Sequence, residues 1–274
     1  MRSRRRARSS TLFLSVFAVA WLYPVVWTLA NAIRSSADIY RAPWDIPWPP
    51  ALGNVGEAWN RGQLGVALVN STYVTALTVV IVIALAVVTA YGLAVLRPPA
   101  RPVLLVLVLA PLMIPTEVLI VPLFSLYRSL GLINSLPGLA MTNVVSSISF
   151  ATVILAGYFR TIPREVIDAA RVDGAGRIAV MLKIVIPLAR PGIVAVAVLV
   201  AVFAWNDFAG ALVLIQRPES FTIQLALTRF STFYATDQGL TFAGVAIAII
   251  PPLVVFLLLR GSFIRALTAG TTRR

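Results

Sequence analysis

The sequence predicts an all-α polytopic membrane protein with six transmembrane helices, and three observations carry this prediction. The 274 residues have a mean hydropathy of +0.90 and only 12% of them are charged, whereas charged residues make up about a quarter of a soluble domain. Six apolar stretches are each long enough to cross a hydrocarbon core of about 30 Å as a helix. The basic residues cluster in short segments between these stretches, as is typical of membrane proteins.

The N-terminal part predicts a basic cytoplasmic segment, a first membrane helix and an external loop. Residues 1–10 hold five arginines, and the apolar run 11–33 that follows exceeds the apolar region of a typical signal peptide. We therefore expect a retained first helix; a cleaved signal peptide is the alternative, because residues 30–32 form an A-x-A pattern. Residues 34–65 hold four prolines, which preclude a long helix, and three tryptophans, which suit a membrane interface.

Residues 66–259 form a predicted five-helix core, and the basic tail 260–274 follows it. The polar segment 160–190 interrupts this core and reads as a hairpin of two short helices around a glycine turn, with the second helix ending at Pro187. The spans expected within the core are 66–96, 103–126, 136–159, 192–216 and 240–259.

The distribution of basic residues orients the chain. Six spans place both termini on one side of the membrane. With the N-terminus inside, the inner segments hold 17 of the 23 basic residues and the outer loops hold six. By the positive-inside rule the two termini, the turn at 97–102 and the hairpin at 160–190 are cytoplasmic.

Polar residues in three of the spans are predicted to lie at one depth. Glu117 and Asp207 lie in the third and fifth spans, and the fourth carries an asparagine and two serines at i, i+3 and i+4, hence on one face. Counted at about 1.5 Å per residue, both carboxylates lie about 21–24 Å from the cytoplasmic ends. Carboxylates within a membrane normally face protein or water, which predicts a polar passage or gate; the alternative is a position at the outer headgroups. The residues assigned to this passage are Glu117, Asn143, Ser146, Ser147, Trp205, Asn206 and Asp207.

The composition excludes several other chemistries. Without cysteine or histidine, the chain has no disulfide, no thiol or imidazole catalysis and none of the usual zinc sites. Its only lysine, Lys183, follows a leucine rather than a glycine, so no Walker A loop holds ATP. The net charge of +13 comes from membrane loops rather than from one continuous basic face, so no nucleic-acid partner is expected.

The hairpin has the features of a docking element. Pro163 suits the first turn of a helix, and the carboxylate of Glu165 interacts favourably with the positive N-terminal end of the helix dipole. Ala169, Ala170 and Gly174 are small, so another surface can approach closely. A loop that is merely solvated would explain the charges but not this small-residue face.

The sequence of this hairpin resembles the signature of the membrane subunits of ABC importers. Asp168-Ala169-Ala170, then Gly174, then Ile184–Pro187 follow the pattern EAA…G…I-x-LP, with Asp168 and Ile186 as departures from its glutamate and leucine. The chain also departs at Ala209-Gly210-Ala211, where the family usually has bulky residues and a proline. The wider similarity is to carbohydrate importers of the maltose and glycerol-phosphate type, and it runs from about Asn70 to the C-terminus. The matching segments are Met113–Pro115, Val121–Phe124, Gly131–Asn134, Phe159–Glu165, Asp173–Ala175, Pro187–Pro191, Trp205–Phe208 and Leu267–Gly270.

The resemblance implies the type I ABC importer permease fold, in which this hairpin, between helices 4 and 5, is the coupling helix that docks on a cytoplasmic ATPase. It implies import of a sugar or sugar derivative (disaccharide, amino sugar, polyol or glycerophosphodiester) by alternating access. No enzymatic activity and no cofactor are expected in this chain, because ATP and Mg²⁺ would bind the ATPase. The docking residues implied are Glu165, Asp168, Ala169, Ala170, Asp173 and Gly174.

The partners implied are a second homologous permease subunit in a heterodimer, two ATPase subunits or a homodimeric ATPase, an extracytoplasmic solute-binding protein, and the bilayer of a prokaryotic cytoplasmic (inner) membrane. Three alternatives remain at this point. The first alternative is a secondary transporter, the second is a membrane-embedded enzyme that uses Glu117 and Asp207, and the third is an ABC permease for a solute other than a sugar.

Overall fold

The computed structural model describes residues 2–45, 48–231 and 236–269, with side chains described for 13–45, 48–115, 118–231 and 236–261. The chain divides into two compact units, one of Met1–Gly65 with Ala226–Ile250 and one of Val66–Leu225 with Pro251–Arg274. Throughout the described residues the regular elements are helices, apart from one isolated bridge between Ser231 and Thr236. The all-α class is confirmed.

The elements of the smaller unit are α1 (Arg2–Asn31), α2 (Ser36–Arg41), α3 (Gly53–Arg61), η6 (Leu227–Phe230) and the first part of α13 (Gln238–Ala269). Those of the larger unit are α4 (Leu64–Tyr91), η1 (Gly92–Leu96), α5 (Arg101–Leu109), η2 (Ala110–Met113), η3 (Thr116–Leu119), α6 (Ile120–Ser129), α7 (Leu136–Phe159), α8 (Arg164–Val172), α9 (Arg177–Val180), η4 (Met181–Val185), α10 (Ile186–Trp205), α11 (Ala209–Leu214), η5 (Pro218–Ser220) and α12 (Ile223–Ala226).

Five helices within the described residues are long and apolar enough to cross a membrane, and they overlap five of the six predicted spans. The fourth span is found at its predicted bounds, Leu136–Phe159. Ser135 accepts a hydrogen bond from the Gly138 N–H and begins this helix, and Pro137 occupies its first turn. The five segments are Phe13–Asn31, Leu64–Leu96, Leu136–Phe159, Arg177–Trp205 and Gln238–Gly261.

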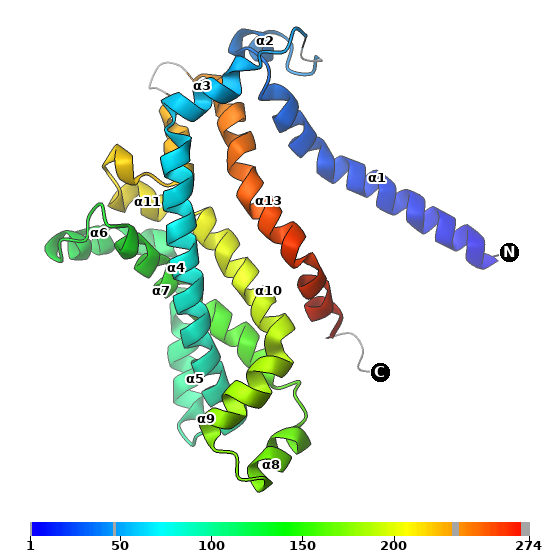
Figure 1. Ribbon diagram of the computed structural model, residues 1–274, viewed down its shortest axis with the longest axis vertical. Coiled ribbons are helices and arrows are strands. Elements are labelled where there is room, and N and C mark those ends of the chain that lie inside the picture. Colours follow the sequence, from blue (N-terminus) through cyan, green and yellow to red (C-terminus); the bar gives the residue numbers. More distant parts are fainter. Residues whose placement is uncertain (1, 46–47, 232–235, 270–274) are drawn as a thin grey trace. The chain divides into compact units, whose positions relative to one another are not determined.

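The third predicted span is not one helix, which corrects the expectation of a continuous helix over 103–126. Helix α5 ends at Leu109, and the 3₁₀ turns η2 and η3 separate it from α6. The cause is a series of prolines, Pro111, Pro115 and Pro122, each of which lacks an N–H donor. Ile114 is extended, as expected of a residue that precedes a proline. In the larger unit, α6 consequently points sideways, away from α4 and α7, instead of running along them (Figure 1).

The second arm of the hairpin is also longer than predicted, because it does not end at Pro187. Helical structure continues from Arg177 to Trp205 through α9, η4 and α10. Pro187 has no N–H for the carbonyl four residues before it. Just before Pro187 the chain forms the π-helical turn Met181–Val185, whose hydrogen bonds span five residues instead of four, and the helix then continues as α10.

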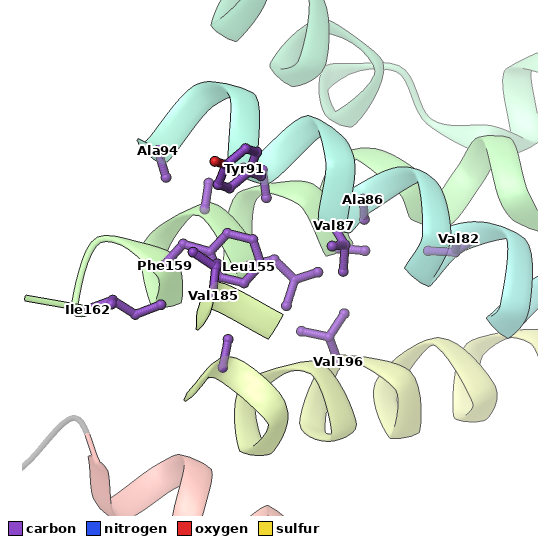
Figure 2. Close-up of a cluster of buried hydrophobic side chains, with 14 of the residues drawn as sticks. Val82, Ala86, Val87, Tyr91, Ala94, Leu155, Phe159, Ile162, Val185 and Val196 are labelled. Atoms are coloured by element: carbon purple, nitrogen blue, oxygen red, sulfur yellow. The ribbon is translucent and has the colours of Figure 1, made fainter. Parts of the chain in front are cut away.

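Helices α4, α7 and α10 pack around an apolar core in the larger unit (Figure 2). The helices approach closely at Gly192 of α10, where an added Cβ would lie 2.6 Å from Cγ of Tyr158. Small residues allow such close approach between membrane helices, whose association depends on van der Waals packing. Ile162 and Ile167 are buried in the same core and fasten α8 to the ends of the spans. The residues labelled in the close-up are Val82, Ala86, Val87, Tyr91, Ala94, Leu155, Phe159, Ile162, Val185 and Val196.

In the smaller unit, hydrogen bonds order part of the segment predicted as an external loop. Arg34 is 4% exposed, and its guanidinium donates to the carbonyl oxygens of Asp38, Ala42 and Pro43. The Asn54 amide donates to the Arg34 carbonyl at 2.7 Å. These bonds satisfy a buried cation with carbonyl oxygens, so the segment folds around Arg34 with two short helices rather than as an open loop.

Candidate functional site

A cavity of about 390 Å³ lies within the larger unit, between α6, α7, the end of α10 and α11. Its volume is within the range of small-molecule sites, about 300–1,000 Å³. The residues that line it are Ile120, Leu123, Thr142, Asn143, Ser146, Ser147, Phe150, Phe203, Asp207, Ala209, Gly210, Val213 and Leu214.

Asp207 brings a carboxylate to this cavity from the break between α10 and α11. Its Oδ1 accepts a hydrogen bond from the Gly210 N–H at 3.0 Å, as a capping side chain does at the start of a helix. Its Oδ2 is buried and has no hydrogen-bond partner among the described residues. A Cβ added at Gly210 would lie 2.7 Å from Oδ2, so the glycine provides the room that this oxygen occupies.

Asn143 brings a carboxamide to the same place from the middle of α7. The residue is 8% exposed, and its amide lies next to the Asp207 carboxylate. Its Nδ2 has no partner of hydrogen-bond geometry in the described part of the chain. A buried amide donor and a buried carboxylate acceptor therefore lie side by side at one cavity wall, where they interact with each other and make few other polar contacts within the described residues.

The remaining wall combines hydroxyl groups and aromatic rings. Ser146 and Ser147 follow Asn143 on the cavity side of α7, and the Ser146 hydroxyl donates to the Thr142 carbonyl at 3.0 Å. The rings of Phe150 and Phe203 meet edge to face, with centroids 5.6 Å apart. An acceptor, a donor, hydroxyls and apolar rings around one space match the surface of a solute that carries both hydroxyl groups and C–H faces.

The structure brings four of the seven predicted passage residues together at this cavity: Asn143, Ser146, Ser147 and Asp207. Trp205 is buried but does not line it. Asn206 is exposed, and its Oδ1 accepts a hydrogen bond from Gln224 Nε2 at 3.2 Å. The side chain of Glu117 lies outside the described side chains, so its assignment stays a prediction.

Sequence reasoning missed the apolar part of the lining and the residues that hold α11 in place. The aromatic and aliphatic lining residues, such as Phe150 and Phe203, are indistinguishable in sequence from lipid-facing ones. The Asn134 Oδ1 accepts from the backbone N–H groups of Gln216 and Arg217, at 2.6 and 2.8 Å, and ties the chain after α11 to the turn before α7. The one signal in the sequence was the asparagine itself, because asparagine tolerates the left-handed region, in which Asn134 lies with a φ of +62°.

The predicted hairpin begins with α8, which ends in a Schellman motif. The Ala175 N–H donates to the Ala170 carbonyl at 2.9 Å and the Gly174 N–H donates to the Arg171 carbonyl at 3.0 Å. Gly174 has a φ of +83°, which a glycine adopts without the Cβ penalty. The sequence thus requires a glycine at 174 for the turn itself, whatever else approaches it.

One face of α8 is packed on the core and the other is exposed. Ile167 is buried and Ala170 is half-buried against the core. Four residues at i, i+3, i+4 and i+7 share the exposed face. This exposed face consists of Glu165, Asp168, Ala169 and Val172, with Val172 87% exposed. Gly174 meets no atom within 4 Å of an added Cβ, and Asp173 is exposed beside it.

The charges of α8 are weakly paired. Asp168 Oδ1 lies 3.4 Å from Nη1 of Arg171, and both side chains are about half exposed. An exposed pair of this kind contributes little, about 0–1 kcal/mol. Among the side chains that the structure describes, no three carboxylates gather into a metal-binding group.

Comparison with known proteins places these features in a family context. A sequence model for the family described as "Binding-protein-dependent transport system inner membrane component" matches residues 82–269. The chain is 33% identical over 264 residues to a probable ABC transporter permease protein, YurM, of Bacillus subtilis (strain 168), covering 96% of this chain and 87% of the relative. It is 30% identical over 272 residues to the diacetylchitobiose uptake system permease protein NgcG of Streptomyces coelicolor, covering 98% of this chain and 90% of the relative.

Among solved structures, the fold is similar to that of a chain in the crystal structure of a bacterial ABC transporter involved in the import of the acidic polysaccharide alginate. The TM-score is 0.79 at 23% sequence identity, and the similarity covers 96% of this chain and 98% of the other. At this identity the likeness shows the fold alone.

Proposed function

The chain belongs to the family of binding-protein-dependent transport system inner membrane components, and we propose that it forms half of the passage of an ATP-driven importer for a sugar or sugar derivative. The family membership confirms the resemblance carried by Asp168-Ala169-Ala170 and Gly174. In this proposal the passage works by alternating access in the cytoplasmic membrane of a prokaryote. ATP is bound and hydrolysed by separate ATPase subunits, and a solute-binding protein outside the membrane delivers the solute.

The observation that carries the proposal is the cavity bordered by Asn143 and Asp207. In a chain that is 59% hydrophobic, a carboxylate and an amide that lie side by side at a cavity, with a buried oxygen and a buried nitrogen that have no other partner among the described residues, point to a polar solute. Sugar hydroxyls are both donors and acceptors, so a single hydroxyl can accept from Asn143 and donate to Asp207. The rings of Phe150 and Phe203 offer an apolar surface to the C–H faces of the sugar.

The charge of the cavity favours a neutral or cationic sugar over an acidic one. Asp207 is the one ionisable residue among the lining residues, and no arginine or lysine accompanies it. An anionic sugar would meet this carboxylate without a compensating cation, which is costly in a site of low dielectric constant. The relative NgcG is named as a diacetylchitobiose uptake system permease, and we extend the saccharide class, though not the individual sugar, to this chain.

The exposed face of α8 is the proposed contact with the ATPase, through which ATP hydrolysis would move the membrane helices. Glu165, Asp168, Ala169 and Val172 present charge, a small residue and an exposed apolar side chain together, which suits a cleft on another protein. Ile167 fastens the other face to the core of α4, α7 and α10. A displacement of α8 would therefore move α7 and α10, which line the cavity. The remaining partner is a second, homologous permease subunit that completes the passage.

Uptake by whole cells tests the proposal. In a strain that lacks this chain, accumulation of one saccharide from a labelled panel should be lost, and the wild-type chain should restore it. Restoration should require ATP and should persist when the proton gradient is collapsed. Uptake by the purified chain alone in liposomes under a pH gradient would instead indicate a secondary transporter, and hydrolysis of a glycan by the chain alone would indicate an enzyme.

A further inference from the structure

We propose that the end of the larger unit formed by η1, α8 and α9 holds the phosphate headgroup of an anionic phospholipid. This site is separate from the cavity at Asp207, and it shares one lining residue, Asp168, with the proposed docking face of α8. Two neighbouring cavities lie there, of about 580 and 200 Å³, and they share the side chains of Leu96, Arg97 and Arg171.

The lining of these two cavities is strongly basic. The larger is bounded by Arg97, Arg171 and Arg177 and has no acidic residue in its wall. The smaller adds Arg160 and Arg164 and contains one carboxylate, Asp168. Five guanidinium groups thus face one carboxylate, and the other acidic residues of this segment, Glu165 and Asp173, line neither cavity. Guanidinium groups bind phosphate oxygens in bidentate fashion, so this composition matches a phosphate.

Two of the arginines are positioned by hydrogen bonds, and a third is paired with a carboxylate. Arg97 ends η1 in the left-handed conformation, with a φ of +50°, and its Nε donates to the Ala94 carbonyl at 3.0 Å, which leaves its two Nη groups for a ligand. The buried Tyr91 hydroxyl donates to the Arg177 carbonyl at 2.9 Å and holds the start of α9 beside η1. The Nη1 of Arg171 lies 3.4 Å from Oδ1 of Asp168, the one carboxylate in the lining.

The surroundings of the cavities favour a lipid over a free anion. The cavities lie at the end of the apolar segment Leu64–Leu96, where a span reaches the headgroup region. Pro98 and Pro99 of the larger cavity lead directly into α5, which buries none of its residues. Its side chains Val103, Val106 and Leu107 are between 62% and 65% exposed. A headgroup in the cavity therefore has an apolar helix beside it for its acyl chains, and basic pockets between membrane helices suit anionic headgroups.

Binding of short-chain lipids to the full chain in detergent tests this site. Dioctanoyl phosphatidylglycerol, dioctanoyl phosphatidylcholine and inorganic phosphate are each titrated, and bound lipid is measured by native mass spectrometry. The variant is the double substitution Arg97→Gln with Arg177→Gln, which leaves the exposed face of α8 intact. Arg190→Gln is the control for each single variant, because it removes one guanidinium from the polar segment 160–190 and Arg190 lines neither cavity.

We expect phosphatidylglycerol to bind more tightly than phosphatidylcholine, and each lost guanidinium to weaken it about 5-fold. The Arg190→Gln chain should bind as the wild type does. If the double variant fails to fold, each single variant is measured instead and should lose about 5-fold. Equal binding of the two lipids, or equal loss in the control, would overturn the proposal. Tight binding of inorganic phosphate without lipid selectivity would also overturn the proposal. Variants that keep lipid selectivity but lose ATPase stimulation in the assembled transporter would overturn it as well, because they would assign the arginines to the ATPase contact.

Discussion

The substitution Asp207→Asn isolates the charge at the cavity from the structure around it. Asparagine keeps an oxygen at the position of Oδ1, so the hydrogen bond from the Gly210 N–H is retained. Asparagine and aspartate are equally good at capping a helix start. The buried Oδ2 is then replaced by an amide nitrogen, which donates hydrogen bonds instead of accepting them. The change therefore removes a charge and an acceptor while the stability of the fold is expected to stay the same.

The size of the effect follows from the bond that is lost. A hydrogen bond to a charged group contributes about 1.5–3 kcal/mol, which corresponds to about 10- to 150-fold in affinity. We expect the half-saturating concentration for transport of a neutral sugar to rise by a factor within this range. Because the repulsion of anions is also removed, the ratio of acidic to neutral sugar transported should increase.

The assay is ATP-driven uptake by the assembled transporter at a series of sugar concentrations, so that affinity and maximal rate are separated. Glu219→Gln is the matched control, since it removes a carboxylate from the exposed turn η5 of the same unit. A uniform fall in maximal rate with unchanged half-saturation would refute the reasoning, because it would place Asp207 in the structure of α11 instead of in contact with the solute.

Two further predictions concern coupling and packing. On the exposed face of α8, Asp168→Lys should abolish uptake and substrate-stimulated ATPase activity while the chain stays in the membrane, and Gly174→Trp should do the same; survival of both activities in both variants would contradict the docking role. In the core, Gly192→Ala places a Cβ 2.6 Å from the Tyr158 ring, and overpacking of this kind costs about 1–3 kcal/mol, so thermal unfolding in detergent should begin at a lower temperature than for Gly157→Ala, where an added Cβ meets no atom within 4 Å.

Local signals were sufficient to predict the fourth span. Ser135 and Pro137 mark its first turn, and the polar segment after Phe159 marks its end, so a contiguous apolar run and its two boundaries define one helix. The third span also has an apolar composition, but Pro111 and Pro115 break it. Composition alone therefore predicted a hydrophobic segment there correctly and its helical continuity wrongly.

The sequence allowed us to predict the depth of the site residues in the membrane, but not which sides of the helices face one another. Counting residues from the ends of the spans placed Asn143 and Asp207 at one level, and the structure brings both to one cavity. Which side of α10 and α11 faces α7 depends on packing between distant parts of the chain. Helix α10 ends at Trp205 and α11 begins at Ala209, and no periodicity in the sequence reports how the chain turns between them.

The most direct test of the account is the accessibility of the cavity during the transport cycle. The chain contains no cysteine, so a single cysteine can be introduced and its reaction with a membrane-impermeant maleimide followed by the mass of this chain. Ser147→Cys lies at the cavity, and Ser149→Cys, buried on the same helix outside the lining, is the control. The account predicts that Ser147→Cys reacts at a rate that changes with ATP and the solute-binding protein and is slowed by the transported sugar. Equal rates at both positions, or a rate at Ser147→Cys that neither ATP nor sugar alters, would contradict it.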